Sequence, residues 1–322
     1  MRSVRWLGLL GLYIGAQVVG LALADPFRSE GLSSTSNPQS AASPLFLIAI
    51  IVIAPLAILL FVRLKGAMAR LRAGILVMIA LSLYVTLYAT FSLIPPASIL
   101  LPPYGAEITY APALTLAGGV TALLFLSLMV EPQWYVVDIT GFIAAGALVA
   151  ILGISFDILP VFILLLALMV YDAIAVYRTK HMVSLADVVT EMKLPILLVM
   201  PDRSGYDYTS APTLQEQRGQ PTEERAAMFM GLGDIVIPGA LIASAFVWLP
   251  TSPHLLGVGA NLLIAGAAML GSLVGYGVLM RLVLGGNPQA GLPLLNGGAL
   301  LGYALAYVLV FHSLTLGLTG GL

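Results

Sequence analysis

Two aspartates, Asp172 and Asp234, lie inside apolar stretches of the sequence, LALMVYDAIAVY and MGLGDIVIPGALIASAFVWLP. A charged side chain at the centre of a membrane helix costs about 2.5–3.5 kcal/mol on insertion scales, so an acid in such a place indicates a function. Two carboxyl groups about 3 Å apart cannot both ionise and must share a proton. One can then act as a base toward water while the other donates a proton to a carbonyl oxygen. Such a pair can hydrolyse a peptide bond without a metal or cofactor.

The composition shows that apolar stretches dominate the whole chain. Of its 322 residues 60% are hydrophobic and 9% are charged, and the mean hydropathy is +1.02. An average soluble domain has about 25% charged residues. Apolar runs of about 20 residues can cross a membrane as helices. We therefore predict an all-α, polytopic membrane protein with nine transmembrane helices, at residues 5–24, 45–64, 73–95, 108–130, 134–154, 156–177, 226–249, 255–281 and 291–317.

The first of these runs has a second interpretation. Arg2 and Arg5, the apolar stretch that follows, and the small residues before Asp25 also resemble a secretory signal with its cleavage site. The sequence leaves open whether this span is ever removed as a signal.

The basic residues predict the orientation of the bundle, since Lys and Arg collect on the cytoplasmic side of membrane proteins. An N-terminus in the cytoplasm leaves only Arg28 on the outer side and predicts that the C-terminus is outside. The cytoplasmic ends and loops then hold Arg2, Arg5, Arg63, Lys65, Arg70, Arg72, Arg178, Lys180, Lys193, Arg203, Arg218, Arg225 and Arg281.

This orientation places the two acids at one depth. Asp172 is about five residues before the cytoplasmic end of the sixth span, and Asp234 is about eight residues after the cytoplasmic start of the seventh. At about 1.5 Å per residue, both lie roughly 8–12 Å below the cytoplasmic surface. We therefore expect the two side chains to meet.

The neighbours of the acids fit a site that admits another chain. Gly231 and Gly233 flank Leu232 just before Asp234, and glycine permits close approach of a second backbone while loosening the helix. Tyr171, before Asp172, either orients substrate through its hydroxyl or anchors the helix at the membrane interface.

Two polar segments separate the spans. Residues 25–44 form a Ser-rich external loop. Residues 178–225 form the largest cytoplasmic loop, which we expect to be partly mobile and which divides the chain into six spans in 1–177 and three in 226–322. Within this loop the apolar run 194–201 is either a strand that pairs with substrate or a segment lying at the membrane surface.

Several classes of function are excluded or disfavoured by residue usage. The chain has no cysteine, which excludes disulfides, a cysteine nucleophile and thiolate metal sites. Its three histidines lie too far apart for an HExxH zinc motif, so we predict no metal and no cofactor. The net charge of −1, without a basic cluster, gives no support for nucleic-acid binding.

At the two acids the sequence resembles the presenilin and signal peptide peptidase family of intramembrane aspartyl proteases. Tyr171-Asp172 matches the family's YD motif, and Gly231-Leu232-Gly233-Asp234 matches its GxGD motif. The resemblance implies that Asp172 and Asp234 are the catalytic dyad. It extends over the nine-span plan and the long loop between the two motifs.

A third family motif, a PAL tripeptide at the start of the ninth span, is only partly matched. The chain reads Gln289-Ala290-Gly291-Leu292-Pro293, so Leu292 and Pro293 align while Ala290-Gly291 stands where Pro-Ala is expected. Glycine and proline at a helix start still leave backbone groups free to pair with a substrate. We expect Gly291, Leu292 and Pro293 to support substrate binding.

The resemblance also implies the surroundings in which the protein acts. The predicted orientation is similar to that of presenilin, and the short loops and small size are similar to those of microbial, archaeal homologues. We therefore expect a multi-pass protein of a prokaryotic cell membrane, in contact with lipid, that cleaves transmembrane helices or remnant signal peptides, alone or as a homo-oligomer.

Other interpretations remain open at this point. Asp138, near the cytoplasmic start of the fifth span, is a rival member of the dyad. Asp157 is most simply a helix-capping acid, and His312 with Ser313 would suggest a serine protease but lacks a nucleophile motif. Prepilin peptidases also carry a GxGD acid. The same acids could serve a transporter or ion pathway as a proton relay, or simply hold helices together in a scaffold.

Overall fold

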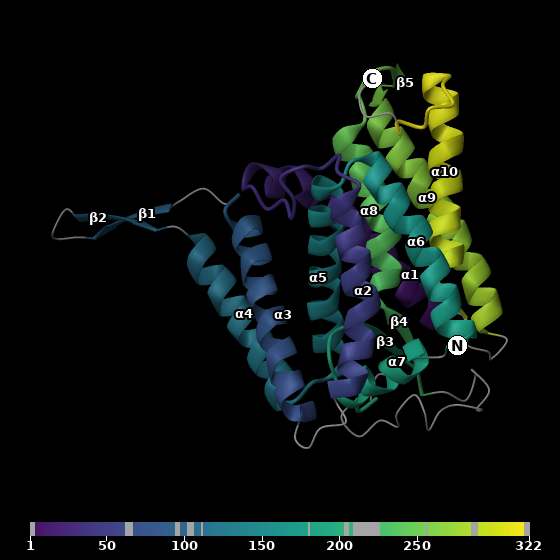
Figure 1. The fold of residues 1–322 in the computed structure, drawn as a ribbon. Coiled ribbons are helices and arrows are strands. Elements are labelled where there is room, and N and C mark those ends of the chain that lie inside the picture. Colours follow the sequence, from purple (N-terminus) through teal and green to yellow (C-terminus); the bar gives the residue numbers. More distant parts are fainter. Residues whose placement is uncertain are drawn as a thin grey trace.

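The structure, a computed structural model, is a bundle of helices (Figure 1). The residues that it describes also form three small β-hairpins. Its α1 to α10 are Val4–Ser29, Ala42–Phe61, Ala67–Phe91, Pro112–Val130, Trp134–Ser155, Ile158–Tyr177, His181–Glu191, Leu232–Trp248, Ala260–Val283 and Leu292–Phe311. The structure describes residues 4–61, 67–93, 97–101, 106–110, 112–179, 181–202, 206–208, 226–255, 257–284 and 289–318.

Eight of the described helices are long and apolar enough to cross a membrane, which supports a multi-pass membrane protein. The seventh expected span, 226–249, corresponds to the shorter α8, because its first residues form a strand instead of a helix. The span count of nine and the orientation of the termini stay predictions. Figure 1 shows the two ends of the chain at opposite ends of the bundle.

Each β-hairpin is an antiparallel pair of strands: β1 (Ala97–Leu101) with β2 (Ala106–Tyr110), β3 (Leu197–Pro201) with β4 (Ala227–Gly231), and β5 (His254–Leu255) with β6 (Val258–Gly259). The β1–β2 hairpin, which the sequence did not predict, projects sideways from α3 and α4 (Figure 1). Within the run 194–201, residues 197–201 form β3, which confirms the strand; its pairing with a substrate stays a prediction. Of the expected cytoplasmic loop, residues 180, 203–205 and 209–225 lie outside the described residues, so its expected mobility is not tested.

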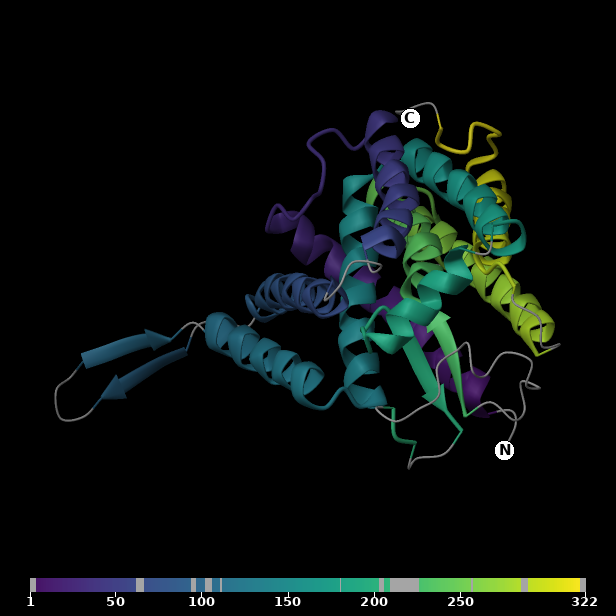
Figure 2. The ribbon, with the colours of Figure 1, turned by 60° about the horizontal axis from the view of Figure 1, so that its bottom comes forward.

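The core of the bundle is formed by α1, α5 and α8, with α6, α9 and α10 around it. In α1 the side chains of Tyr13, Ala16 and Gln17 are completely buried. Helices α3 and α4 pack mainly on each other and lie on one flank of the bundle (Figure 2). The elements that bear the two acids therefore belong to the best-packed part of the molecule.

Helices α9 and α10 are in backbone contact along a row of glycines. A Cβ atom added to Gly271 would strike the carbonyl oxygen of Gly298, and one added to Gly298 would strike that of Gly271. Gly275 and Gly302 make equally close approaches to the facing helix. Two Gly-xxx-Gly spacings, one on each helix, create this contact, as is common between membrane helices. The contact fixes the start of α10 relative to α9.

Replacing Gly271 by alanine should destabilise the protein by about 1–3 kcal/mol, because the methyl group has no space between the two backbones. The better helix propensity of alanine, about 1 kcal/mol, only partly offsets this loss. Thermal unfolding in detergent measures the effect. The control is Gly277→Ala on the same helix, where an added Cβ meets no atom within 4 Å. Equal unfolding temperatures for both variants would contradict the close contact.

Candidate active site

Asp172 lies near the C-terminal end of α6 and points toward the start of α10. Its side chain is 6% exposed, and its Oδ2 atom accepts a hydrogen bond of 3.0 Å from the backbone N–H of Leu292. The N–H of Gly291 also bonds this carboxyl. These donors are available because the first N–H groups of a helix have no partner within the helix. The start of α10 therefore holds Asp172 in place.

Asp234 lies in the first turn of α8, immediately after β4. The sequence placed it about two turns inside a span, but residues 227–231 are extended and the helix begins only at Leu232. Gly231 caps the helix in an extended conformation, and its N–H bonds the Asp234 carboxyl. An acid in the first turn is stabilised by the helix dipole. This local arrangement accounts for the GxGD spacing at Gly231 and Asp234.

The two carboxyl groups lie beside the same peptide unit, Gly291–Leu292. Leu292 donates its N–H to Asp172, and a Cβ atom added to Gly291 would lie only 2.8 Å from Oδ1 of Asp234. The structure thus brings α6, α8 and the start of α10 together at one point, and a side chain at position 291 would displace the Asp234 carboxyl.

The β3–β4 hairpin sets the position of Asp234. Leu197 of β3 lies opposite Gly231 of β4, and the N–H of Leu232 donates to the carbonyl oxygen of Ile196 at 3.0 Å. Because this bond continues the ladder into the first residue of α8, the strand pairing fixes where the helix begins. Asp234 follows two residues later.

Tyr177 ties the end of α6 to the segment that precedes α10. Its hydroxyl donates to Oε1 of Gln289 at 2.9 Å and accepts a hydrogen bond of 3.2 Å from the N–H of Ala290. The sequence analysis missed this residue, and helix periodicity gave no signal for it, since a residue five positions after Asp172 lies about 140° around the helix from it. Tyr171 is partly buried against the main apolar core, and Pro293 lies in the first turn of α10.

Comparison with known proteins shows the family to which this chain belongs. The family model described as signal-peptide peptidase, presenilin aspartyl protease matches residues 10–312. The chain belongs to this family. It is therefore an aspartic endopeptidase that acts within membranes.

Two solved structures titled as a presenilin family intramembrane aspartate protease resemble the whole chain. The one in space group C222 has 30% sequence identity and a TM-score of 0.61, and the match covers 94% of this chain and 99% of that chain. The one in space group P2 has 33% identity and a TM-score of 0.60, with 94% and 97% covered. No curated protein sequence matches the chain.

Asp138 and Asp157, the other acids considered in the sequence, do not share the contacts of Asp172 and Asp234. Asp138 is buried on α5, and its Oδ1 atom accepts a hydrogen bond of 2.7 Å from the N–H of Val199 in β3. The interpretation of Asp138 as a rival dyad member is thus not supported, since its carboxyl bonds the hairpin and not the Gly291–Leu292 unit. Asp157 caps α6 by accepting from the N–H of Ile158 at 2.7 Å, as expected.

His312 and Ser313 do not form a catalytic pair. His312 ends α10 in a left-handed conformation, and the hydroxyl of Ser313 pairs with that of Thr315 at 2.9 Å. Within the described parts of the chain, no group of three or more His, Cys, Asp or Glu side chains could hold a metal ion.

Replacing Gly291 by alanine should lower the turnover of this protease by about 10- to 100-fold, because the new methyl group displaces the Asp234 carboxyl. Cleavage of a transmembrane substrate in detergent or proteoliposomes measures the effect. The control is Gly297→Ala in α10, the helix that Gly291 precedes, where the added Cβ would make an ordinary contact of 3.8 Å with Met169. Full activity of the Gly291 variant would show that the carboxyl is not held there.

Proposed function

We propose that Asp172 and Asp234 are the catalytic dyad, and that the protein uses them to hydrolyse peptide bonds in transmembrane helices or remnant signal peptides. The observation that carries this proposal is that both carboxyls lie beside the Gly291–Leu292 peptide unit. Substrate helices and membrane lipid are then its partners. The proposal also includes a prokaryotic cell membrane as the location, an N-terminus in the cytoplasm, assembly as a homo-oligomer, and a supporting role for Tyr171.

The proposed chemistry needs one proton shared between the two acids. The ionised carboxyl removes a proton from water, whose oxygen bonds the peptide carbon, while the protonated carboxyl gives its proton to the carbonyl oxygen. The tetrahedral diol then loses a hydroxyl proton to the carboxylate, the C–N bond breaks, and the leaving nitrogen takes a proton from the other acid. One water is consumed, and the dyad again holds one proton.

The β-hairpin supports a route for the substrate. The bonds Leu232–Ile196 and Asp202–Ala226 define the hydrogen-bonded pairs of the β3–β4 ladder. Hydrogen-bonded pairs alternate with pairs that are not hydrogen-bonded along an antiparallel ladder. Ala227, Phe229 and Gly231 belong to the second kind, so their N–H and C=O groups point away from β3. The sequence proposed the run 194–201 as the pairing edge, but the far edge of β3 contacts Asp138. We propose that an unwound substrate pairs with the outer edge of β4, which leads to Asp234.

Asp172→Asn and Asp234→Asn should each abolish cleavage while the protein stays folded, because an amide can neither accept nor donate the shared proton. Cleavage of a transmembrane substrate by the purified variants measures this. Asp157→Asn is the matched control, since it removes an aspartate from the other end of α6, where asparagine caps a helix equally well.

Substantial activity in either dyad variant would disprove the proposed role of that acid. Ion flux into sealed vesicles without proteolysis would instead support a proton relay.

Replacing Phe229 by proline should reduce cleavage by about tenfold or more, because it removes an outward N–H from β4 without removing a bond to β3. The Michaelis constant should rise more than the turnover number falls. Phe229→Leu is the control, as it shortens the side chain but keeps the N–H group. If both variants lose activity equally, the side chain and not strand pairing is responsible.

A further inference from the structure

The buried acid Asp138 has no part in the proposed chemistry, yet it contacts the hairpin that positions Asp234. It lies in the second turn of α5 and is 6% exposed. Its bond to Val199 reaches the edge of β3 that faces away from β4, since Val199 belongs to a pair that is not hydrogen-bonded within the ladder. Strand β3 is therefore held on both edges, by β4 on one side and by Asp138 on the other.

The packing around this bond leaves β3 little freedom to move. Leu198 and Val199 are completely buried. Gly141, one turn after Asp138, faces the strand so closely that an added Cβ would lie 3.1 Å from Leu198 and 3.4 Å from the carbonyl oxygen of Pro195. Helix α5 thus supports β3 through one hydrogen bond and one close contact.

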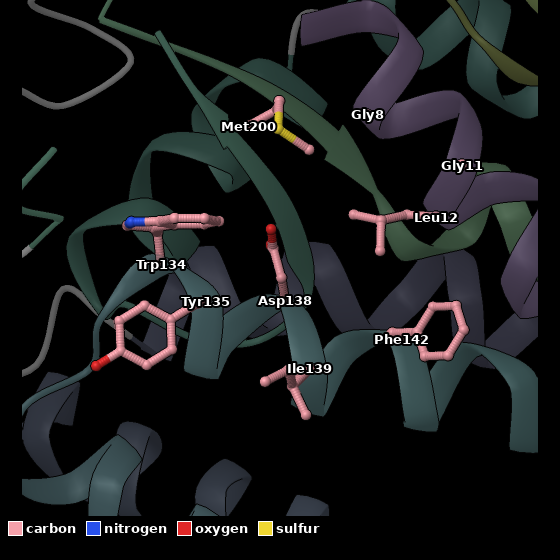
Figure 3. A pocket seen from close by; sticks show the side chains of 9 residues that line it. All are labelled: Gly8, Gly11, Leu12, Trp134, Tyr135, Asp138, Ile139, Phe142 and Met200. Atoms are coloured by element: carbon pink, nitrogen blue, oxygen red, sulfur yellow. The ribbon is translucent and has the colours of Figure 1, made fainter. Parts of the chain in front are cut away.

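An apolar cavity of about 430 Å³ lies beside Asp138, between α1 and α5. Figure 3 shows the carboxyl of Asp138 directed from α5 toward the side where Met200 lies. The other residues that line the cavity are glycines or present apolar or aromatic surface to it: Gly8, Gly11, Leu12, Trp134, Tyr135, Ile139, Phe142 and Met200. Because a buried polar group without a partner costs about 1–3 kcal/mol, this surrounding favours the bond to the strand.

We propose that Asp138 is a positioning residue of the protease, which fixes β3 and, through β4, the place of Asp234 relative to Asp172. This inference rests on the proposed function of the two acids. The connection is short. Strand β3 pairs with β4 along its whole length, and the ladder ends at Leu232, which lies in the same helical turn as Asp234. A displacement of about 1 Å at a reacting group can reduce a rate by about 100-fold.

The test compares two substitutions at one position. Asp138→Asn keeps an oxygen that can accept from the N–H of Val199, so cleavage should stay within about threefold of the wild type. Asp138→Leu removes the acceptor, and turnover should fall by about 10- to 100-fold. Mass spectrometry of the products should also show cleavage spread over neighbouring peptide bonds, which a general loss of stability would not cause.

The matched control is Thr140→Val, which removes another buried polar group from α5. The Thr140 hydroxyl has no partner among the described residues, so this variant should cleave as the wild type does. If Asp138→Leu fails to fold, Gly141→Ala replaces it, because its methyl group pushes Leu198 away while leaving Asp138 intact. We expect the same broadened set of cleavage positions and a smaller loss of turnover.

Wild-type rates and cleavage positions in Asp138→Leu, or in Gly141→Ala where the former does not fold, would overturn the proposal. So would an asparagine variant as inactive as the leucine variant, since the charge and not the hydrogen bond would then matter. The same assay includes Asp172→Asn and Asp234→Asn. If these two still cleave, the proposed dyad has failed, whatever the result at Asp138.

Discussion

The arrangement of the site depends on the need to satisfy two carboxyl groups in an apolar bundle, that of Asp172, which is buried, and that of Asp234, which is partly buried. A buried polar group must find a hydrogen-bond partner, and within a membrane most backbone donors are already used by helices. Donors are free where a helix begins and along the outer edge of a strand. Asp172 bonds the N–H groups at the start of α10, and Asp234 bonds the N–H of Gly231 at the start of α8. Each acid is therefore located at a helix end.

The rest of the bundle positions these helix ends. The glycine contacts between α9 and α10 fix the axis of α10, and Tyr177 fixes the segment before it. On the other side, α5 holds β3 through Asp138, and β3 holds β4, which leads directly into α8. The helices α3 and α4 lie on the flank and contribute little to this arrangement. The site thus depends on α5, α6, α8, α9, α10 and the β3–β4 hairpin.

The multi-pass helical bundle could be predicted from the sequence, because long apolar runs report directly on the membrane. Asp172 and Asp234 could be recognised by their apolar surroundings and motifs. The start of α8 could not, since the residues of β4 are as apolar as a helix and only pairing with β3 makes them extended. The hydrogen bond of Asp138 was also hidden: its partner is a backbone N–H distant in the sequence, and no residue type indicates such a bond.

The chain's membership of the presenilin and signal peptide peptidase family agrees with this arrangement. The central claim is that the carboxyl groups of Asp172 and Asp234 lie close together. The most direct measurement is the separation of the Asp172 and Asp234 carboxyl carbons in an experimental structure of the wild-type protein in lipid. The account predicts a separation within about 7 Å, allowing for the looser geometry of a site without substrate, with Gly291–Leu292 beside both groups. Carboxyls on opposite sides of the bundle, without a shared contact at Gly291–Leu292, would contradict it.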